Sequence, residues 1–464
     1  MYRKKDRQTM SLFPELFPLG GGLRAENRWM KLGRLIPWNQ MEEVYREHFS
    51  DRMGRPAKDS RLICGLLVVK HMKGFSDEEV VEEYLENPYI QAFSGEEMFV
   101  TEGGIDPSLL SKTRKRLGKT FFRRFEKDVL EVLKRRRIIR PGEHLLDATV
   151  IPVNIEYPTD AKLLNRARRW VVKVINVIRQ RCGVKEKVRT YCRKAQWAYL
   201  GFQKKRKKTR AMIRLMRGKL LRYLRRNIRQ LEELLREHGR RLKKAERTFL
   251  CKRLAVVKTI YDQQREMWKT KARSVKDRIV SLHLPHIRPI VRGKDGKEVE
   301  FGPKALLSWT DGFGFLDALK FNAHNEGALW GKSLDLRKER FGEYPEESTG
   351  DGIFGTRVNR AMLEKKGVRG GVKALGRAAN TTENRKWLRE KRRLRGSRME
   401  GIIGHAKNHF GLNRIRYTVP DGEEMWIRLG LLAMNLSTAL KKAEKRVRRG
   451  AGNGWVTGEA GATA

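Results

Sequence analysis

The stretch Leu145-Leu-Asp-Ala-Thr-Val-Ile-Pro-Val-Asn154 decides the fold class of this 464-residue chain. It is rich in β-branched residues and partly alternates between apolar and polar positions, which predicts a β-strand. Asp147 stands in the middle of this apolar run, where a carboxylate is costly unless it is solvated, paired or bound to a cation. The alternative is an acid at the end of a strand that caps the next element.

The region before this strand, from about residue 39 to residue 137, predicts an all-helical unit. Residues that favour helix N-caps precede its apolar runs, at Asn39, Asp59-Ser60, Ser76 and Asp106-Pro107. Helices of this size joined by short turns suit a helix-turn-helix arrangement on DNA, and they suit a plain helical bundle equally. Both alternatives stay open on the residues alone.

A long basic stretch follows the strand. Residues 162–231 contain one acid, Glu186, and they include the cluster Lys204, Lys205, Arg206, Lys207 and Lys208. Apolar residues at helical spacing predict a helical hairpin or bundle that reaches about Ser274. The whole chain has 103 Lys and Arg against 54 Asp and Glu, a net charge of +49, which indicates a polyanionic partner. A solvated basic face is the weaker alternative, because its like charges repel each other.

The C-terminal half of the chain returns to strands. Asp295-Gly296 predicts a hairpin turn, and Asp311-Gly312 marks a turn between two further strands. Helices and short strands then alternate, and two long helices are predicted over about 383–410 and 423–447. A meander of strands followed by alternation with helices indicates a mixed sheet.

The first residues and the most apolar segments of the chain indicate where the protein is expected in the cell. The first residues lack the apolar stretch and the small-residue cleavage site of a signal peptide. The most apolar windows, near 62–70 and 429–440, are far shorter than the ~20 residues of a membrane-spanning helix. We therefore expect a cytoplasmic protein that associates with the nucleoid and not with a membrane.

Three acids stand in distinct settings and are candidates for chemistry: Asp147 in the predicted strand, Asp351 at a strand end and Glu400 in a predicted helix. Carboxylates from separate elements can converge, and hard oxygen ligands gathered in this way bind Mg²⁺ or Mn²⁺. Two such ions ~4 Å apart activate an oxygen nucleophile and stabilise a departing 3′ oxygen. Spacing alone does not show that the acids meet, because the chain has 54 of them.

The predicted helix around Glu400 has a geometry that can be worked out. Each residue turns ~100° about the helix axis, so Lys407 returns to within ~20° of Glu400 and shares its face. Lys407 would suit a DNA phosphate, and an ordinary helix-surface pair is the alternative. His405 and His409 have the spacing of a metal-ligand pair, but they lie ~140° and ~180° from Glu400 and are not expected to join the acids.

Several longer strings carry a resemblance. In the N-terminal region they are residues 54–79 and 105–117, and further on they are Leu146-Asp-Ala-Thr-Val150, residues 154–160, Gly350-Asp-Gly-Ile-Phe-Gly-Thr-Arg-Val-Asn-Arg360 and Met399-Glu-Gly-Ile-Ile-Gly-His-Ala-Lys407 with the residues up to 416. Together they resemble bacterial DDE transposases of the insertion-sequence-five family over nearly the whole chain. Residues 287–294 and 299–304 look like further strands of that family's catalytic core.

The resemblance implies roles for the three acids. It places the first, second and final catalytic acid of the DDE motif on Asp147, Asp351 and Glu400, which would hold Mg²⁺ or Mn²⁺, as two ions. It places a companion base on Lys407.

The resemblance also bears on DNA contacts near the final acid. The family usually has an Arg four residues before that Glu. Here Gly396 stands at this position, between Arg395 and Arg398, which are the candidates for the DNA contact.

The fold class that the resemblance implies is mixed α+β. We expect an all-helical DNA-binding domain over 1–140 and an RNase H-like core over 141–161 and 275–447, in which a mixed sheet is flanked by helices and the acids lie at adjacent strand ends and on a helix. A basic helical insertion would span 162–274 between the first two core strands, and residues 448–464 are predicted to be a disordered tail.

The implied function is that of a transposase. It would bind double-stranded DNA at the terminal inverted repeats of an insertion sequence, cut the end with water and join the freed 3′-OH to target DNA. It would work as a homo-oligomer that holds two element ends. A non-catalytic DNA-binding relative and an RNA-directed nuclease with the same core remain the alternatives.

Overall fold

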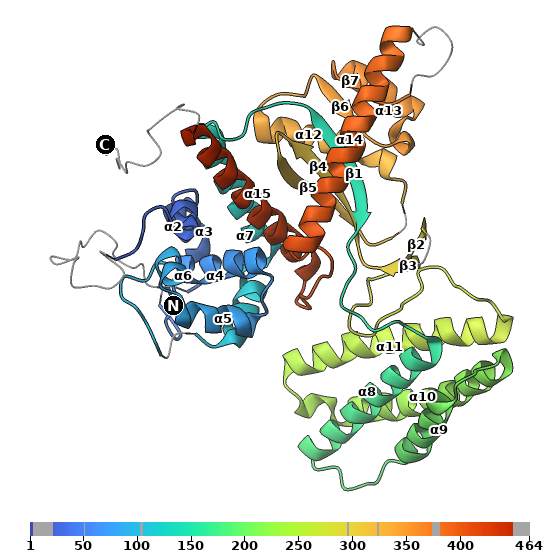
Figure 1. Cartoon of the computed structure of the whole chain (residues 1–464). Helices are drawn as coiled ribbons and strands as arrows, with labels where there is room; N and C mark the ends of the chain where they lie inside the picture. Colours follow the sequence, from blue (N-terminus) through green and yellow to red (C-terminus); the bar gives the residue numbers. More distant parts are fainter. Residues whose placement is uncertain are drawn as a thin grey trace. The chain divides into compact units, whose positions relative to one another are not determined.

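The computed structural model describes residues 1–2, 22–50, 52–102, 105–294, 297–322, 324–373 and 381–448. It contains two compact units (Figure 1). The sheet unit comprises Met1–Val153, Lys304–Lys320 and His324–Ala464, and the bundle unit comprises Asn154–Pro303 with Phe321–Ala323. The bundle unit is therefore inserted in the sequence between two strands of the sheet unit.

Each unit has its own set of α-helices and strands. The helices of the sheet unit are α2 (Arg28–Gly33), α3 (Trp38–Arg46), α4 (Ser60–Lys73), α5 (Asp77–Glu86), α6 (Pro88–Phe93), α7 (Pro107–Arg135), α12 (Trp330–Phe341), α13 (Arg357–Lys365), α14 (Thr382–His409) and α15 (Gly422–Arg448). Its strands are β1 (His144–Val150), β4 (Lys304–Thr310), β5 (Phe313–Lys320), β6 (Glu347–Thr349) and β7 (Arg369–Gly370). The bundle unit contains α8 (Asp160–Arg181), α9 (Cys192–Lys204), α10 (Arg210–His238), α11 (Lys244–Thr270), β2 (Pro289–Lys294) and β3 (Lys297–Phe301).

The N-terminal helices begin mostly where the sequence predicts. Asp59 accepts hydrogen bonds from the first backbone N–H groups of α4, and Asp106 does the same for α7. Ser76 forms a capping box with Glu79 at the start of α5. The prediction for Asn39 was wrong: α3 begins at Trp38, so Asn39 lies inside the first turn of the helix.

The five-stranded sheet is mixed, with the strand order β5-β4-β1-β6-β7. Strand β1 is central. It runs antiparallel to β4, where Asp147 faces Leu307, and parallel to β6, where Leu145 faces Thr349. The predicted strand around Asp147 is confirmed, and because Asp147 lies inside β1 and pairs with Leu307, the reading as an acid at a strand's end does not hold.

A buried polar network holds β1 and β6 beside each other. His144 at the start of β1 has Nδ1 2.8 Å from Ser348 Oγ on β6, and Trp330 on α12 donates to the same oxygen at 2.8 Å. The other ring nitrogen of His144 lies 3.2 Å from Ser333 Oγ, which in turn donates to Asp317 on β5. Because all these side chains are buried, each hydrogen bond replaces one that water would otherwise make.

Helix α15 joins the N-terminal helices to the sheet. Its residues 425–436 are almost all buried, and it packs against α4, α7 and β5 (Figure 1). The Asn435 side chain bonds both backbone groups of Gly314 on β5, and Arg428 pairs with Glu126 on α7. The structure thus differs from the expected boundary at residue 140, because the helices before it share one compact unit with the sheet.

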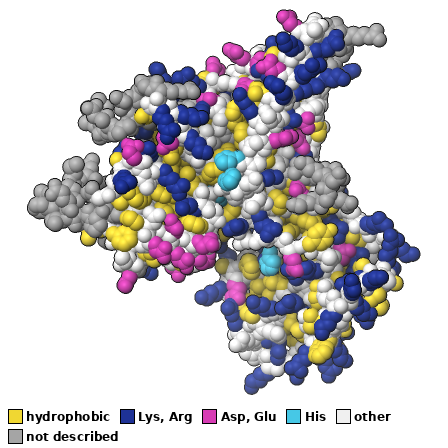
Figure 2. Space-filling view, in the orientation of Figure 1, with side chains coloured by type: hydrophobic (Ala, Val, Ile, Leu, Met, Phe, Trp, Pro, Cys, Tyr) yellow, Lys and Arg dark blue, Asp and Glu magenta, His cyan; other side chains and the backbone are white. Residues whose placement is uncertain are grey.

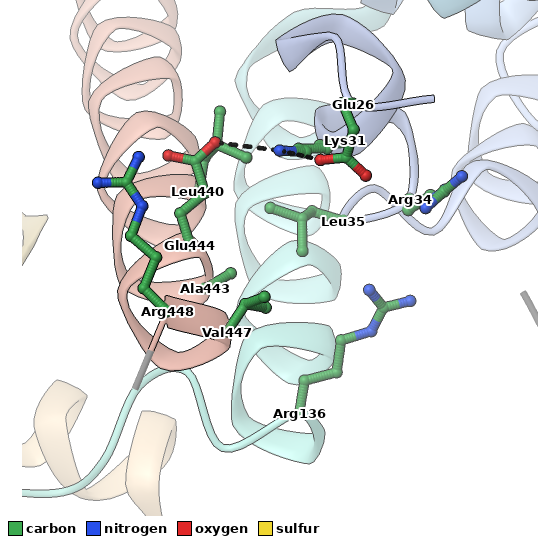
Figure 3. Close-up of a pocket in the computed structure, with 10 residues that line it drawn as sticks. All are labelled: Glu26, Lys31, Arg34, Leu35, Arg136, Leu440, Ala443, Glu444, Val447 and Arg448. Carbon is green, nitrogen blue, oxygen red and sulfur yellow. Dashed lines mark hydrogen bonds and ion pairs between the residues drawn. The ribbon is translucent and has the colours of Figure 1, made fainter. Parts of the chain in front are cut away.

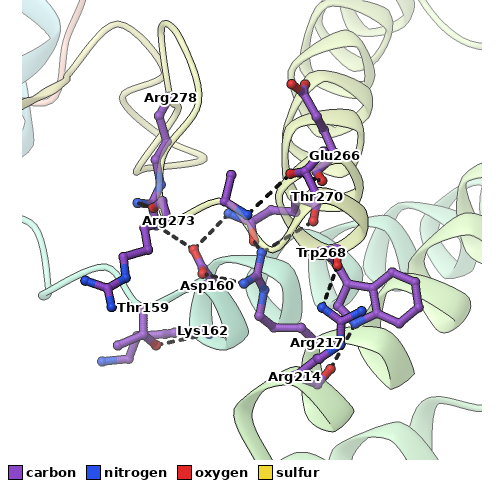
Figure 4. Close-up of polar contacts among 12 residues, drawn as sticks. Thr159, Asp160, Lys162, Arg214, Arg217, Glu266, Trp268, Thr270, Arg273 and Arg278 are labelled. Carbon is purple, nitrogen blue, oxygen red and sulfur yellow. Dashed lines mark hydrogen bonds and ion pairs between the residues drawn. The ribbon is translucent and has the colours of Figure 1, made fainter. Parts of the chain in front are cut away.

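The bundle unit is the predicted basic helical segment. Helices α8, α9, α10 and α11 enclose an apolar core, which confirms the predicted bundle. Asp160, at the start of α8, accepts from Gln264 on α11 and pairs with Arg217 on α10 and with Arg278 beyond α11 (Figure 4). One partly buried carboxylate therefore fixes the start of α8 against two further helices.

The hairpin of β2 and β3 departs from the expected core. These strands pair antiparallel with each other, but they form a separate two-stranded sheet within the bundle unit. The bundle unit accordingly begins at Asn154 and extends to Pro303, beyond the expected limits of 162 and 274. The predicted turn Asp295-Gly296 and residues 449–464 of the predicted tail lie outside the described residues.

The later predictions in the sheet unit are confirmed. Strands β4 and β5 flank the Asp311-Gly312 turn, and the two long helices are α14 and α15. No helix in the described ranges combines the length and the apolar composition that crossing a membrane requires.

Candidate active site

The register of the sheet brings two predicted acids to the same level. Leu145 on β1 pairs with Thr349 on β6 in parallel orientation, and each predicted acid lies two residues further along, at Asp147 and Asp351. Side chains two residues apart on a strand point to the same face, and neighbouring strands lie about 4.8 Å apart. Asp147 and Asp351 therefore lie side by side, although 204 positions separate them in the sequence.

One guanidinium lies between these two carboxylates. Arg395 on α14 has Nη1 3.2 Å from Oδ2 of Asp147 and Nη2 3.7 Å from Oδ1 of Asp351. The Asp147 side chain is 24% exposed, whereas that of Asp351 is 61% exposed and accepts a hydrogen bond from the Gly352 N–H at 2.6 Å. The two acids thus share a cation at the edge of the solvent.

A regular row of side chains positions α14 over the strands. Trp387 and Lys391 both bind Glu347 at the start of β6, and the Trp387 Nε1 donates at 3.0 Å. Arg395 follows at the same spacing of four, and then comes Met399, which is 1% exposed. Residues four apart share one helix face, so this face of α14 is turned toward β6 and β1.

Glu400 lies off that face. It is one residue beyond the buried Met399, about 100° further round the helix, and it is exposed. It makes no hydrogen bond or ion pair within the described part of the chain, whereas the predicted companion, Lys407, donates to Thr149 Oγ1 at 2.9 Å and to the Val150 carbonyl at 3.2 Å. Lys407 therefore reaches the end of β1, and Glu400 does not meet the other two acids.

The acids fit a divalent cation in part. Asp147 on β1 and Asp351 just beyond the end of β6 are hard oxygen donors that already share one positive charge, and Mg²⁺ and Mn²⁺ prefer such donors. In the ranges that the structure describes, however, no three His, Cys, Asp or Glu side chains lie close enough to hold a metal ion. The arrangement thus brings together two of the three acids that were expected to bind metal, and Glu400 stands apart.

The remaining predicted DNA contacts fall into two classes. Arg398 pairs with Glu143 and stacks over the Trp309 ring at 5.1 Å, so its charge is already used within the sheet unit. The cluster from Lys204 to Lys208 lies at the end of α9 and in the following loop, and all five of its side chains are exposed without an ion pair to any described carboxylate. Lys and Arg cover much of the visible face of the bundle unit (Figure 2).

The histidine pair stays apart from the acids. The rings of His405 and His409 lie 4.8 Å apart on α14, and His405 also contacts the Phe410 ring. Burial lowers the pKa of His405, and the neighbouring His409 and Lys441 add to this lowering. The two rings are tilted against each other, and burial favours the neutral form of His405.

A separate pocket lies at the C-terminal end of α15. It is lined by Lys31 and Leu35 near α2 and by Leu440, Glu444 and other residues of α15, and Lys31 bridges Glu26 and Glu444 at 2.7 and 3.4 Å (Figure 3). None of the predicted catalytic acids lines it. We assign it no role in the chemistry.

Sequence reasoning missed the position of Arg395. It was a candidate for a DNA contact, but the structure places it between two carboxylates of its own chain. The spacing of four from Trp387 through Lys391 to Arg395 was visible in the sequence, yet it identifies only a common helix face and not the acids that this face meets.

Comparison with known proteins bears on the N-terminal helices. Residues 19–116 match the family described as Transposase domain (DUF772). An uncharacterized protein of Rhizobium meliloti, described as ORF8 in the nfe locus, is 38% identical over 148 residues, which cover 31% of this chain and 70% of that protein. The chain belongs to a transposase family.

The transposase domain ends before the acids. The matched segment contains α2 to α6 and the first turns of α7, and Asp147, Asp351 and Glu400 all follow it. No solved structure matches the chain. Family membership therefore suggests transposition and a DNA partner, and the chemistry at the acids is argued from the structure.

Proposed function

We propose that the chain is a DDE transposase that cuts DNA and joins strands at Asp147 and Asp351, with Glu400 as the third acid. The observation that carries the proposal is the shared cation, because Asp147 on β1 and Asp351 just beyond the end of β6 lie at the same level and both bind Arg395. Carboxylates are otherwise out of place on a surface that must attract phosphate, unless a metal ion neutralises them.

The sheet supports an RNase H-like core. It is mixed, two acids lie on or beside neighbouring strands, and the helix that carries the third acid packs on β1 and β6. These are the features that the resemblance implies. Glu400 is the exception, and the proposal requires it to approach the pair when DNA and metal are bound.

The side chains of the site have distinct tasks. Asp147 and Asp351 would hold the divalent cation, which would supply activation of the attacking oxygen and neutralisation of the developing charge. Arg395 holds the two acids together until they bind metal, and Lys407, anchored at the end of β1, offers a positive charge beside them. The N-terminal helices would bind the terminal repeats, and a homo-oligomer would hold two element ends.

Strand transfer on DNA that carries the element's inverted repeats tests this proposal. In Mg²⁺, Asp147→Ala and Asp351→Ala should each remove the joined product while DNA binding persists. Full activity in either variant would reject the assigned site. A duplex of RNA and DNA offered in place of the DNA duplex distinguishes the RNA-directed nuclease.

The second candidate is a DNA-binding relative without catalysis. It is favoured by the position of Glu400, which is exposed and apart from the acid pair. Such a protein should bind DNA more weakly as salt rises and gain nothing from Mg²⁺ beyond that screening. A transposase should bind Mg²⁺ at Asp147 and Asp351 independently of this effect.

A further inference from the structure

A pocket of about 340 Å³ lies between the end of α4 and the end of α14. Lys70, His71 and Lys73 line it from α4, and Lys407 and Arg416 line it from α14 and the segment that follows. It lies entirely within the sheet unit. It therefore joins the matched transposase domain to the helix that carries Glu400.

The charge of this pocket has one sign. Four Lys or Arg side chains line it, and its lining contains no carboxylate. Lys70 binds Asp77 behind the pocket at 2.7 Å, and the Lys73 Nζ is 4.0 Å from Glu83. Arg416 is exposed and makes no ion pair within the described residues. The pocket thus carries more positive charge than its nearest acids neutralise.

The cations around Lys70 also act on each other. Burial lowers the pKa of the Lys70 ammonium, the ion pair with Asp77 opposes this, and the nearby Arg114 and Arg416 lower the pKa further. Like charges held at close range cost free energy. An anion in the pocket would remove this cost.

A buried imidazole adds a neutral donor to the lining. His71 is 2% exposed, its Nε2 lies 3.4 Å from the Tyr417 hydroxyl, and burial lowers its pKa to about 3 although the Phe410 backbone opposes the shift. The ring is therefore neutral near pH 7. When the Tyr417 hydroxyl donates to Nε2, the ring proton of the neutral imidazole lies on Nδ1. This Nδ1 is buried and makes no hydrogen bond of ordinary geometry within the described residues.

We propose that this pocket binds one phosphate of the DNA backbone, held jointly by Lys73 from the transposase domain and by Arg416 and Lys407 from the α14 side. The inference rests on the proposed function, because that function supplies DNA as the partner. A tetrahedral anion satisfies several Lys and Arg donors at once, and charge-assisted hydrogen bonds are the stronger kind. The bound phosphate would fix the DNA relative to the C-terminal end of α14.

A structural role for the lysines is the alternative. Lys70 and Lys73 stand in the last turn of α4, where cations stabilise the negative end of the helix dipole. In that case Lys73 would contribute to stability and not to DNA binding. Coupling between Lys73 and Arg416 in DNA affinity distinguishes the two roles, because Arg416 lies outside α4.

The test is a double-variant cycle on the full chain, with a 30-base-pair DNA duplex as the probe. Lys73→Gln and Arg416→Gln should each weaken binding roughly 5- to 10-fold and lower the slope of log affinity against log salt by about 1. Because both side chains would hold one phosphate, the double variant should weaken binding by clearly less than the product of the two effects. Lys73→Arg should keep affinity within about twofold.

A control pair calibrates the cycle. Lys386 is exposed on α14, lies outside the pocket lining and forms no ion pair with any described residue, so Lys73→Gln and Lys386→Gln should combine multiplicatively. Independent, multiplicative effects of Lys73→Gln and Arg416→Gln would overturn the inference, as would unchanged affinity in either variant. Thermal unfolding of each variant checks that it folds.

Failure of this inference is separable from failure of the proposed function. The cycle measures binding at equilibrium and needs no catalysis. If Asp147→Ala keeps full strand transfer, the proposed function fails whatever the cycle gives. If Asp147→Ala loses strand transfer while the cycle is multiplicative, only the phosphate pocket fails.

Discussion

The two units of the molecule differ in how much of their positive charge is balanced by acids. Residues 154–303 of the bundle unit contain 44 Lys and Arg against 13 Asp and Glu, a net charge of +31, whereas the rest of the chain has 59 against 41, a net charge of +18 over twice the length. In the sheet unit cations repeatedly join elements through acids, as Arg428 does with Glu126 and Glu424. In the bundle unit Asp160 joins Arg217 and Arg278 in the same way, but the run 204–208 faces solvent without an ion pair to any described acid.

We infer from this difference that the paired cations of the sheet unit stabilise the fold, whereas the exposed cations of the bundle unit face a polyanionic partner. A cation that is paired and partly buried fixes two elements relative to each other, because removing one member leaves the other unpaired. An exposed, unpaired cation contributes little to folding and is available to phosphate. We therefore expect chemistry to depend on the sheet unit and sequence-independent DNA affinity to depend on the bundle unit.

The largest expected effect concerns the acid pair. Asp351→Asn should lower the rate of strand transfer by roughly 10³-fold or more, because it removes one of the two proposed ligands of the divalent cation. DNA affinity should stay within about threefold. Single-turnover rates at saturating DNA measure the first quantity. Asp335→Asn is the matched control and should keep the rate of strand transfer. Asp335 is an exposed acid on α12 that pairs with Lys366.

The second effect belongs to the bundle unit. Replacing Lys204 to Lys208 by Gln should weaken DNA binding roughly 10²-fold at low salt and reduce the salt slope by about 4, equally for any DNA sequence. The strand-transfer rate at saturating DNA should not change. A loss of rate at saturation with unchanged affinity would contradict the division between the units.

The third effect is a dependence of stability on pH. Burial lowers the pKa of His144 to about 4, the Arg340 and Arg337 cations add to this, and Asp317 opposes it. The unfolded chain takes up the proton near pH 6.5, before the folded chain does, so stability is full above that pH and is lost as pH falls toward 4. The expected slope is about 1.4 kcal/mol per pH unit.

Urea unfolding of the wild type and His144→Gln at pH 7 and pH 5 measures this slope. The variant should be less stable at pH 7 because it disturbs the bonds to Ser348 and Ser333. Its loss between pH 7 and pH 5 should be smaller than that of the wild type by up to about 2 kcal/mol. An equal loss in both proteins would show that His144 is already protonated in the fold.

The smallest effect concerns Arg395. Since its guanidinium occupies the position between Asp147 and Asp351, a divalent ion must displace it. Arg395→Gln should therefore tighten Mn²⁺ binding in the absence of DNA by roughly 3- to 10-fold. Calorimetric titration measures this, with the exposed Arg392→Gln as control. Weaker Mn²⁺ binding in Arg395→Gln would mean that the arginine assembles the ligands and does not compete with the ion.

Local features of this structure could be predicted from the sequence. The β-branched run gives β1, and the cap residues Asp59, Ser76 and Asp106 give the starts of three helices, because these preferences act over a few residues. The long basic helices also follow from apolar spacing. The prediction of a helix cap at Asn39 was wrong, because α3 already begins at Trp38.

Long-range features could not be predicted in this way. The pairing of Leu145 with Thr349, which sets Asp147 level with Asp351, depends on strands about 200 residues apart, and no local preference encodes it. The hairpin of β2 and β3 has strand periodicity, but periodicity does not reveal which sheet a strand joins. Resemblance supplied the acids as candidates, and only the fold shows which two of them meet.

Anomalous diffraction from crystals grown with Mn²⁺ would show whether Asp147 and Asp351 bind a metal ion together. We expect a manganese peak within ligand distance, about 2.2 Å, of carboxylate oxygens from both Asp147 and Asp351, with the Arg395 guanidinium moved away from them. The same crystals of Asp351→Asn should lose or weaken this peak. A manganese site elsewhere, with Arg395 still bridging the two carboxylates at saturating Mn²⁺, would show that Asp147 and Asp351 are not metal ligands.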